Sequence, residues 1–186
     1  MKKALLLMIT CLMAMSMHAQ NEHMKFMGIP LNGTIAAFQS KLQAKGIKYD
    51  AKMSAEIKDP CRAFHGVFSG YDADIYVYYN EKTKVVYRAK AVIKYNDKEI
   101  GESKFSDFKY NLKNKYANAY SYDGEQNDHP SLSLNVPDSK EERQIGTIDL
   151  YITNALYSFM DEVYLHVDYT DTPNKKVNEK ENWDDL

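Results

Sequence analysis

Cysteine is scarce in this sequence: among 186 residues only Cys11 and Cys61 are cysteines. If Cys11 leaves with the N-terminal segment described below, Cys61 is the single remaining cysteine, and no intramolecular disulfide can form. No histidine-adjacent or glycine-flanked motif surrounds Cys61. We therefore expect it to be a small buried apolar side chain rather than a nucleophile.

The sequence also lacks an excess of basic residues. Lys and Arg total 24 against 26 Asp and Glu, which gives a formal net charge of −2. Removing Lys2 and Lys3 with the N-terminal segment makes the net charge −4. Sequence-independent nucleic-acid binding depends on a basic face, so we expect no nucleic-acid partner.

Long apolar runs are missing after the N-terminus, so no later segment approaches the ~20 residues that a membrane-spanning helix needs. Residues 1–19 begin with two lysines, continue with a short apolar run and end in small residues, the layout of a secretory signal peptide. We predict cleavage after Ala19, with Ser16 as the second choice. Lipidation at Cys11 is disfavoured because Met-Ile-Thr precedes it. The mature protein is expected in the periplasm or at the cell surface, without a membrane span.

Motifs for catalysis and metal binding are missing as well. The histidines after residue 20 are scattered and show no zinc-site spacing: His23, His65, His129 and His166. The acidic stretch 123–128 lacks calcium-loop spacing, and no nucleophile elbow, phosphate-binding loop or dinucleotide fingerprint occurs. We expect no metal and no cofactor. A non-catalytic protein is favoured, although paired-carboxylate enzymes leave no local motif.

What the sequence does contain begins with two amphipathic helices. The first is predicted to start at Asn32 or Thr34, and the second at Ser103 or Ser106, because these side chains can cap a helix. Their apolar stripes have the same i, i+3, i+7 spacing and lie 70 residues apart: Ile35, Phe38 and Leu42, then Phe105, Phe108 and Leu112.

After each helix the apolar period changes from 3.6 to 2, which is typical of strands. Each half then reads as one helix followed by about four strands. We predict an α+β fold: an antiparallel sheet with helices on one face, formed by a tandem repeat over residues 20–97 and 98–170. The two halves are either duplicates or merely similar units. Residues 171–186 are polar and aperiodic, and we expect a disordered tail.

Tyrosine is abundant, with 15 residues, and five of them fall within residues 73–95. Alternation places Tyr79, Tyr87 and Tyr95 with the apolar core residues and leaves other side chains on the opposite sheet face. The outward positions include our candidate binding residues: Tyr76, Tyr78, Arg88, Tyr151, Tyr164 and His166. Tyrosine also suits half-exposed strands, so these residues could serve only as cross-strand pairs.

Two resemblances accompany these patterns. The segment FMGIPLNGTIAAFQSKLQAKGI, residues 26–47, resembles the N-terminal part of a group of small exported proteins of the Bacteroidetes, and it carries no chemistry. The twofold succession of one helix and four strands is similar to the β-lactamase inhibitor protein fold, which implies a concave sheet face that grips a target. This sequence lacks the cysteine pairs of those repeats, so the inhibitory activity is not carried over.

The sequence thus predicts an exported, non-catalytic binding protein that recognises a protein or glycan partner at the cell envelope through a tyrosine-rich sheet face. The competing interpretation is a small exported hydrolase that uses a carboxylate or His166 in a cleft on that face. A third interpretation is a structural component of an envelope assembly.

Overall fold

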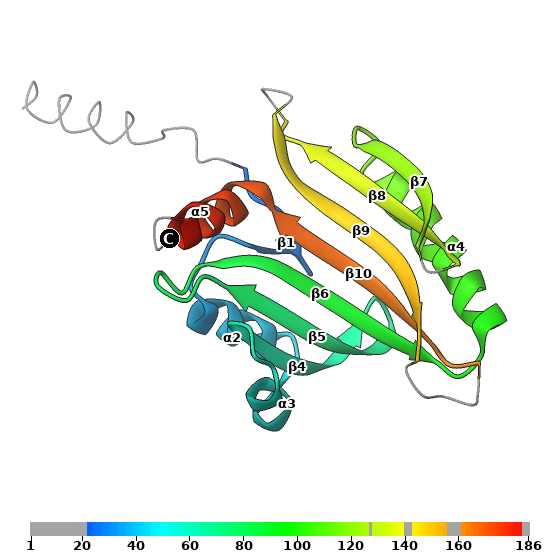
Figure 1. The fold of residues 1–186 in the computed structure, drawn as a ribbon, viewed down its shortest axis with the longest axis horizontal. Helices are drawn as coiled ribbons and strands as arrows, with labels where there is room; N and C mark the ends of the chain where they lie inside the picture. The colour runs from blue at the N-terminus through cyan, green and yellow to red at the C-terminus, as the bar shows by residue number, and fades with distance from the viewer. Residues whose placement is uncertain (1–21, 127, 140–142, 156–160, 184–186) are drawn as a thin grey trace, which may run out of the picture.

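A computed structural model describes residues 22–126, 128–139, 143–155 and 161–183. The predicted signal peptide, residues 1–19, lies outside the described residues. The fold is dominated by one eight-stranded antiparallel sheet with the order β3-β4-β5-β6-β10-β9-β8-β7, and β1 and β2 form a separate hairpin (Figure 1). The strands are β1 (Lys25–Phe26), β2 (Ile29–Pro30), β3 (Lys48–Asp50), β4 (Cys61–Phe68), β5 (Tyr71–Tyr79), β6 (Val86–Tyr95), β7 (Tyr120–Gln126), β8 (His129–Pro137), β9 (Gln144–Asn154) and β10 (Val163–Asp171). The predicted α+β class with an antiparallel sheet is confirmed.

The helices of the described residues are α2 (Ile35–Ala44), α3 (Ala51–Glu56), α4 (Lys98–Lys115) and α5 (Thr172–Trp183). As predicted, Thr34 caps α2, because its side chain accepts a hydrogen bond from the amide of Ala37. The predicted start of the second helix at Ser103 or Ser106 is wrong. The Asp97 side chain accepts from the amide of Ile100 and so starts α4 earlier. In the described part of the chain, no helix is both long and apolar enough to cross a membrane.

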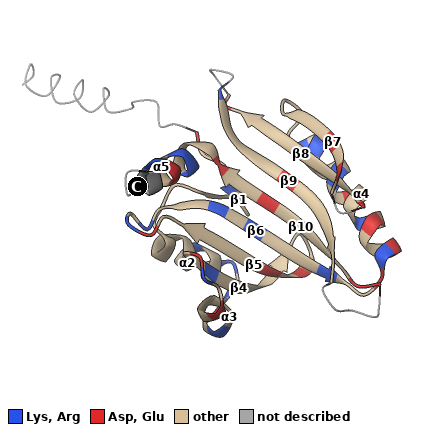
Figure 2. Ribbon diagram, viewed as in Figure 1, with Lys and Arg blue, Asp and Glu red and all other residues tan. Residues whose placement is uncertain are grey.

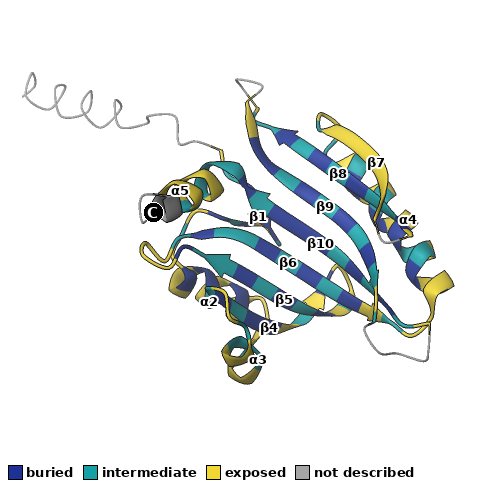
Figure 3. Cartoon of the chain, viewed as in Figure 1, coloured by how far each residue is buried: buried dark blue, intermediate teal, exposed yellow. Residues whose placement is uncertain are grey.

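The hydrophobic core lies on one side of the sheet, beneath α2, α4 and the β1–β2 hairpin. The Phe68 ring of β4 stacks on Phe26 of the hairpin at a centroid distance of 5.3 Å and on Phe108 of α4 at 6.4 Å. Burial alternates along the central strands, as Figure 3 shows, so every second side chain points into this core. The predicted inward residues of the second half are all buried: Ile148, Leu150, Ile152, Val163, Leu165 and Val167.

The remaining side chains of the central strands point away from the helices, and we call this side the open face. In Figure 1 no helix crosses in front of the middle of β6, β10 and β9. The two halves of the chain meet where β6 pairs with β10. Each half contributes four neighbouring strands to the sheet. The tandem repeat itself stays a prediction.

A β-bulge in β6 corrects one expectation about the tyrosines. Tyr78 pairs with Arg88 whereas Tyr79 pairs with Val86, so Tyr87 is the extra residue between them. The bulge shifts the alternation by one position, and Val86 is fully buried while Tyr87 is only half-buried. The prediction that Tyr87 belongs to the core is therefore wrong. Tyr79 and Tyr95 do pack against the core.

The expected disorder of residues 171–186 is also wrong for their described part, because residues 172–183 form α5; residues 184–186 lie outside the described residues. The fully buried Asp171 carboxylate accepts from the amides of Asn174, at 3.0 Å, and Met24, at 2.9 Å, and contacts His23. Burial raises the pKa of Asp171 above its usual range. The Asn174 side chain donates to the main-chain oxygen of Leu31 at 2.6 Å. Polar contacts, rather than an apolar stripe, hold this helix, so composition alone did not reveal it.

Gly146 of β9 supplies a stability test of the packing between the N-terminal segment and the sheet. A Cβ at this position would overlap the Met24 side chain and the main-chain oxygen of Thr170. Gly146→Ala should lower the free energy of unfolding by about 2 kcal/mol, the usual size of overpacking effects, in urea titrations followed by circular dichroism.

The control for this test is Gly33→Ala, where the nearest atom to the new Cβ is the Cβ of Ala37 at 4.0 Å. The unfolding midpoint of this variant should be close to that of the wild type. Equal unfolding midpoints for the two variants would show that the site around Gly146 relaxes freely.

Candidate functional site

All the predicted binding residues lie on the open face, on four neighbouring strands. They come from β5 (Tyr76, Tyr78), β6 (Arg88), β10 (Tyr164, His166) and β9 (Tyr151). In the sheet these strands follow one another as β5-β6-β10-β9, and the register brings their side chains into rows. Figure 2 shows that basic residues on β6 lie beside acidic residues on β10 and β9. The sheet therefore gathers into one surface residues that are up to 90 positions apart in the chain.

Two aromatic–cation pairs occupy the β5–β6 part of the open face. The Arg88 guanidinium carbon lies 4.8 Å from the centroid of the Tyr78 ring, and the Lys90 Nζ lies 5.4 Å from that of Tyr76. In each pair the two residues are direct cross-strand partners. Burial lowers the pKa of Lys90 and raises that of Tyr78 to about 12. Contacts of this kind hold the tyrosine rings in place.

The centre of the open face is a buried ion pair between Arg88 and Asp168. The Nε of Arg88 donates to both carboxylate oxygens of Asp168, at 2.9 and 3.0 Å, and its Nη2 donates to Oδ2. Asp168 is only 4% exposed. The hydrogen bonds to Asp168 raise the pKa of Arg88. Arg88 is thus a fixed part of the surface and not a free cation.

A second carboxylate, Asp149, lies directly opposite Asp168 on the neighbouring strand β9. Its Oδ1 accepts a hydrogen bond of 2.6 Å from the Ser133 hydroxyl. No described cation forms an ion pair with Asp149. Alternation placed both carboxylates on the outward side, but choosing them as site residues required the register between β9 and β10.

His166 forms a stacked pair with Tyr151. The ring centroids are 4.5 Å apart and the ring planes differ by 6°. The Nε2 of His166 lies 2.8 Å from the hydroxyl oxygen of Thr153. Burial, together with the charges of Lys90 and Arg88, lowers the pKa of His166 to about 4. The imidazole is therefore neutral at pH 7, and it is a weak base that supports the Tyr151 ring.

A groove crosses the open face beside this pair and follows β8. Its volume is about 420 Å³, within the usual range of small-ligand sites. Tyr122 of β7 and Tyr151 of β9 stand on either side, and small side chains lie between them. The full lining is Arg88, Tyr122, Asp123, Gly124, Gln126, Ser131, Leu132, Ser133, Asp149, Leu150, Tyr151 and Asp168. Our sequence reasoning missed Tyr122, although the alternating stretch YSYDG could have indicated it.

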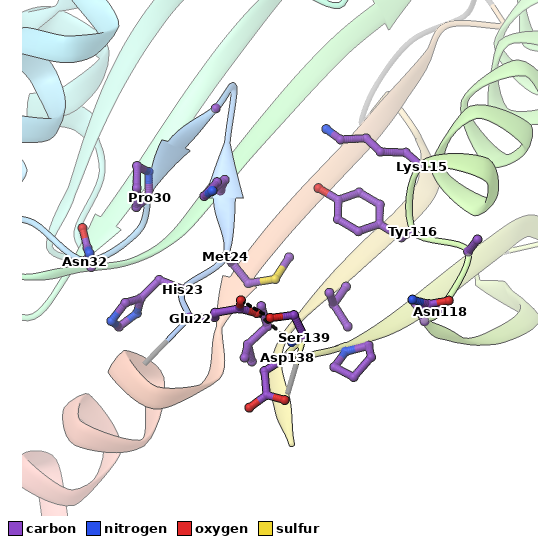
Figure 4. A pocket seen from close by; sticks show the side chains of 17 residues that line it. Glu22, His23, Met24, Pro30, Asn32, Lys115, Tyr116, Asn118, Asp138 and Ser139 are labelled. Carbon is purple, nitrogen blue, oxygen red and sulfur yellow. Dashed lines mark hydrogen bonds between the residues drawn. The ribbon is translucent and has the colours of Figure 1, made fainter. Parts of the chain in front are cut away.

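A larger cavity of about 860 Å³ lies on the helix side, between the N-terminal segment and the end of α4 (Figure 4). It contains none of the predicted site residues. Glu22 on its wall accepts hydrogen bonds from the amide and hydroxyl of Ser139, the amide at 2.8 Å, and His23 contacts the buried Asp171. These groups hold the N-terminal segment against β10 and the residues that follow β8.

The described residues contain no metal-binding cluster, and their one cysteine, Cys61, is buried. In the part of the chain that the structure describes, no three His, Cys, Asp or Glu residues gather closely enough to hold a metal ion. Cys61 is 6% exposed, opposite Tyr78, and burial raises its thiol pKa to about 12. The expectation that Cys61 is a buried side chain is therefore confirmed.

Comparison of the chain with protein-family models, curated proteins and solved structures finds no match. The resemblances described from the sequence stay predictions, and the functional conclusion rests on the geometry of the open face.

Proposed function

We propose that this protein is an exported, non-catalytic binding protein that recognises a protein or glycan partner at the cell envelope through its open face. The observation that carries this proposal is the group of half-buried tyrosines on neighbouring strands of a sheet face that the described helices leave uncovered. Each of Tyr76, Tyr78 and Tyr151 is held by a cation or by a stacked imidazole. Tyrosine combines a large apolar ring with a polar tip and is enriched at binding surfaces.

Preorganisation supports the same conclusion. A side chain that is already fixed loses little conformational freedom on binding, and tyrosine has only two side-chain torsions to restrict. The Arg88–Asp168 ion pair and the Tyr151–His166 stack fix these side chains on the neighbouring strands β6, β10 and β9. The face is therefore built as a firm contact surface.

The polar groups of the face also favour binding over catalysis. Both oxygens of Asp168 are held by Arg88, and Oδ1 of Asp149 is held by Ser133. His166 has a pKa of about 4, and no carboxylate among the described residues hydrogen-bonds to it. A general base needs a pKa near the working pH and usually an orienting partner.

A pull-down tests the proposal: the protein is used to capture partners from cell-envelope extracts and polysaccharide fractions, and the captured amount is measured. Tyr76→Ala/Tyr164→Ala should reduce capture at least about tenfold, because each tyrosine contributes on the order of 1 kcal/mol at an interface. The matched control is Tyr110→Ala, since Tyr110 is 69% exposed on α4. Undiminished capture by the double variant, with both proteins folded by circular dichroism, would place binding elsewhere.

A further inference from the structure

The groove over β8 exists because its floor consists of small residues. Ser131 lies opposite Tyr151 on one side and Gly124 on the other, and Ser133 lies between Asp149 and Tyr122. The large side chains of Tyr122 and Tyr151 thus lie on the two flanking strands, while the serines of β8 lie between them. The result is a trough with an aromatic wall on each side.

Both tyrosine walls can accept the flat face of a ligand. Tyr122 is 62% exposed, and no described ring or cation stacks on it. Tyr151 has one ring face against His166, and its other neighbour, Ser131, is too small to cover the opposite face. Carbon-bound hydrogens of a pyranose ring pack well against such aromatic faces, because they present a flat apolar patch to the electron-rich ring.

The floor offers hydrogen-bond acceptors and donors without described partners. Oδ2 of Asp149 accepts no hydrogen bond from a described residue, and the side chains of Gln126 and Ser131 form none. Asp168 is neutralised by Arg88, so the groove keeps the negative charge of Asp149. This charge favours ligand hydroxyl or ammonium donors and repels carboxylates and sulfates.

The floor does not resemble the centre of a protein–protein interface. Such centres are apolar and bury aliphatic or aromatic anchors in pockets. Leu132 and Leu150 border the groove, but both are buried, at 2% and 0% exposure, on strand positions that point into the core. A ligand in the groove can therefore contact hydroxyl, amide and carboxylate groups between two tyrosines. A polyhydroxylated ligand matches this set.

We propose that the β8 groove binds a glycan chain whose sugars are neutral or carry amino groups, with Tyr122 and Tyr151 stacking on sugar rings and Asp149 accepting hydroxyl or ammonium hydrogens. This inference rests on the proposed function, because it narrows the partner of the open face to a glycan. The groove selects against acidic sugars through the uncompensated charge of Asp149.

Calorimetric titration with purified hexasaccharides tests this inference on the mature protein. The probes are hexamers of glucose in α- and β-1,4 linkage, xylose, mannose, N-acetylglucosamine, glucosamine and galacturonic acid. At least one neutral or amino hexamer should bind and the galacturonic acid hexamer should not. Tyr122→Ala should weaken binding about tenfold, whereas Tyr110→Ala should leave it unchanged.

Asp149→Asn separates recognition from folding. The change keeps the shape and the acceptor for Ser133 but removes a negative charge that lies directly opposite Asp168. Arg88 already pairs with Asp168, so the thermal midpoint should stay close to that of the wild type while affinity for the amino hexamer falls. A variant that simply misfolded would lose both thermal stability and affinity for the hexamer.

Two outcomes would overturn the inference: none of the hexamers binds, or binding persists unchanged in Tyr122→Ala. If no hexamer binds while capture from envelope extracts still depends on Tyr76 and Tyr164, the proposed function stands with a protein partner and the glycan inference fails. If capture is independent of Tyr76 and Tyr164 and hexamer binding is independent of Tyr122, both proposals fail.

Discussion

Replacing Arg88 with methionine should lower the free energy of unfolding by about 3 kcal/mol at pH 7, the cost of leaving a buried carboxylate without its partner. Asp168 is 4% exposed and receives all its hydrogen bonds among the described residues from Arg88. The Arg88 side chain is 35% exposed, so we expect the lower end of the range for buried pairs. Urea unfolding followed by circular dichroism measures the change.

Two further variants test the cause of this loss. Arg88→Met/Asp168→Leu removes both charges and should recover most of the lost stability, because no unpaired carboxylate remains in the sheet. Lys94→Met removes a half-exposed cation of β6 from its ion pair with Glu162, the residue before β10, and should change stability little. If Arg88→Met matched Lys94→Met, Asp168 would be better solvated than its burial indicates.

Acidification from pH 6.5 to pH 4 should destabilise the wild type through His166 by about 3 kcal/mol. The pKa of His166 is about 4 in the folded protein, below the ordinary value of 6.5. Between these two pH values the unfolded chain binds a proton that the folded protein does not bind. The stabilising contribution is therefore complete above pH 6.5 and is lost as the pH falls toward 4.

Comparison with His166→Gln isolates this contribution. The variant has no titrating group at this position, so the stability difference between the two proteins should change by about 3 kcal/mol between pH 7 and pH 4. The raised pKa of Asp171 acts in the opposite direction, with stability lost as the pH rises, but it is present in both proteins and cancels. Parallel curves for the two proteins would mean that His166 has the same pKa in the folded protein as in the unfolded chain.

Local patterns predicted the sidedness of the sheet well. The apolar residues of β9 and β10 and the outward tyrosines follow a strict period of two, which reflects the pleat of a strand and does not depend on its neighbours. The cap at Thr34 is equally local. Prediction failed where a distant contact overrides the pattern: the bulge at Tyr87 requires β5 beside β6, and α5 is held by Asp171 and Asn174 against the N-terminal segment.

In the candidate site, too, local patterns predicted which face a residue occupies but not which distant residue it contacts. The six predicted residues could be assigned to one face from alternation alone, but their partners could not. Arg88 and Asp168 are 80 residues apart and meet because β6 pairs with β10. The groove needs Tyr122, Ser131 and Tyr151 on three neighbouring strands.

By itself, the sequence determined the α+β class, the antiparallel strands, the helix at residues 35–44 and the face to which each candidate tyrosine points. Periodicity carries this information because helix and strand geometry repeat within a few residues. Only the tertiary structure decided which charges pair, which tyrosine stacks on His166 and where the small residues of β8 leave a groove. Those contacts depend on strand order and register across the sheet, which arise from packing of the whole core.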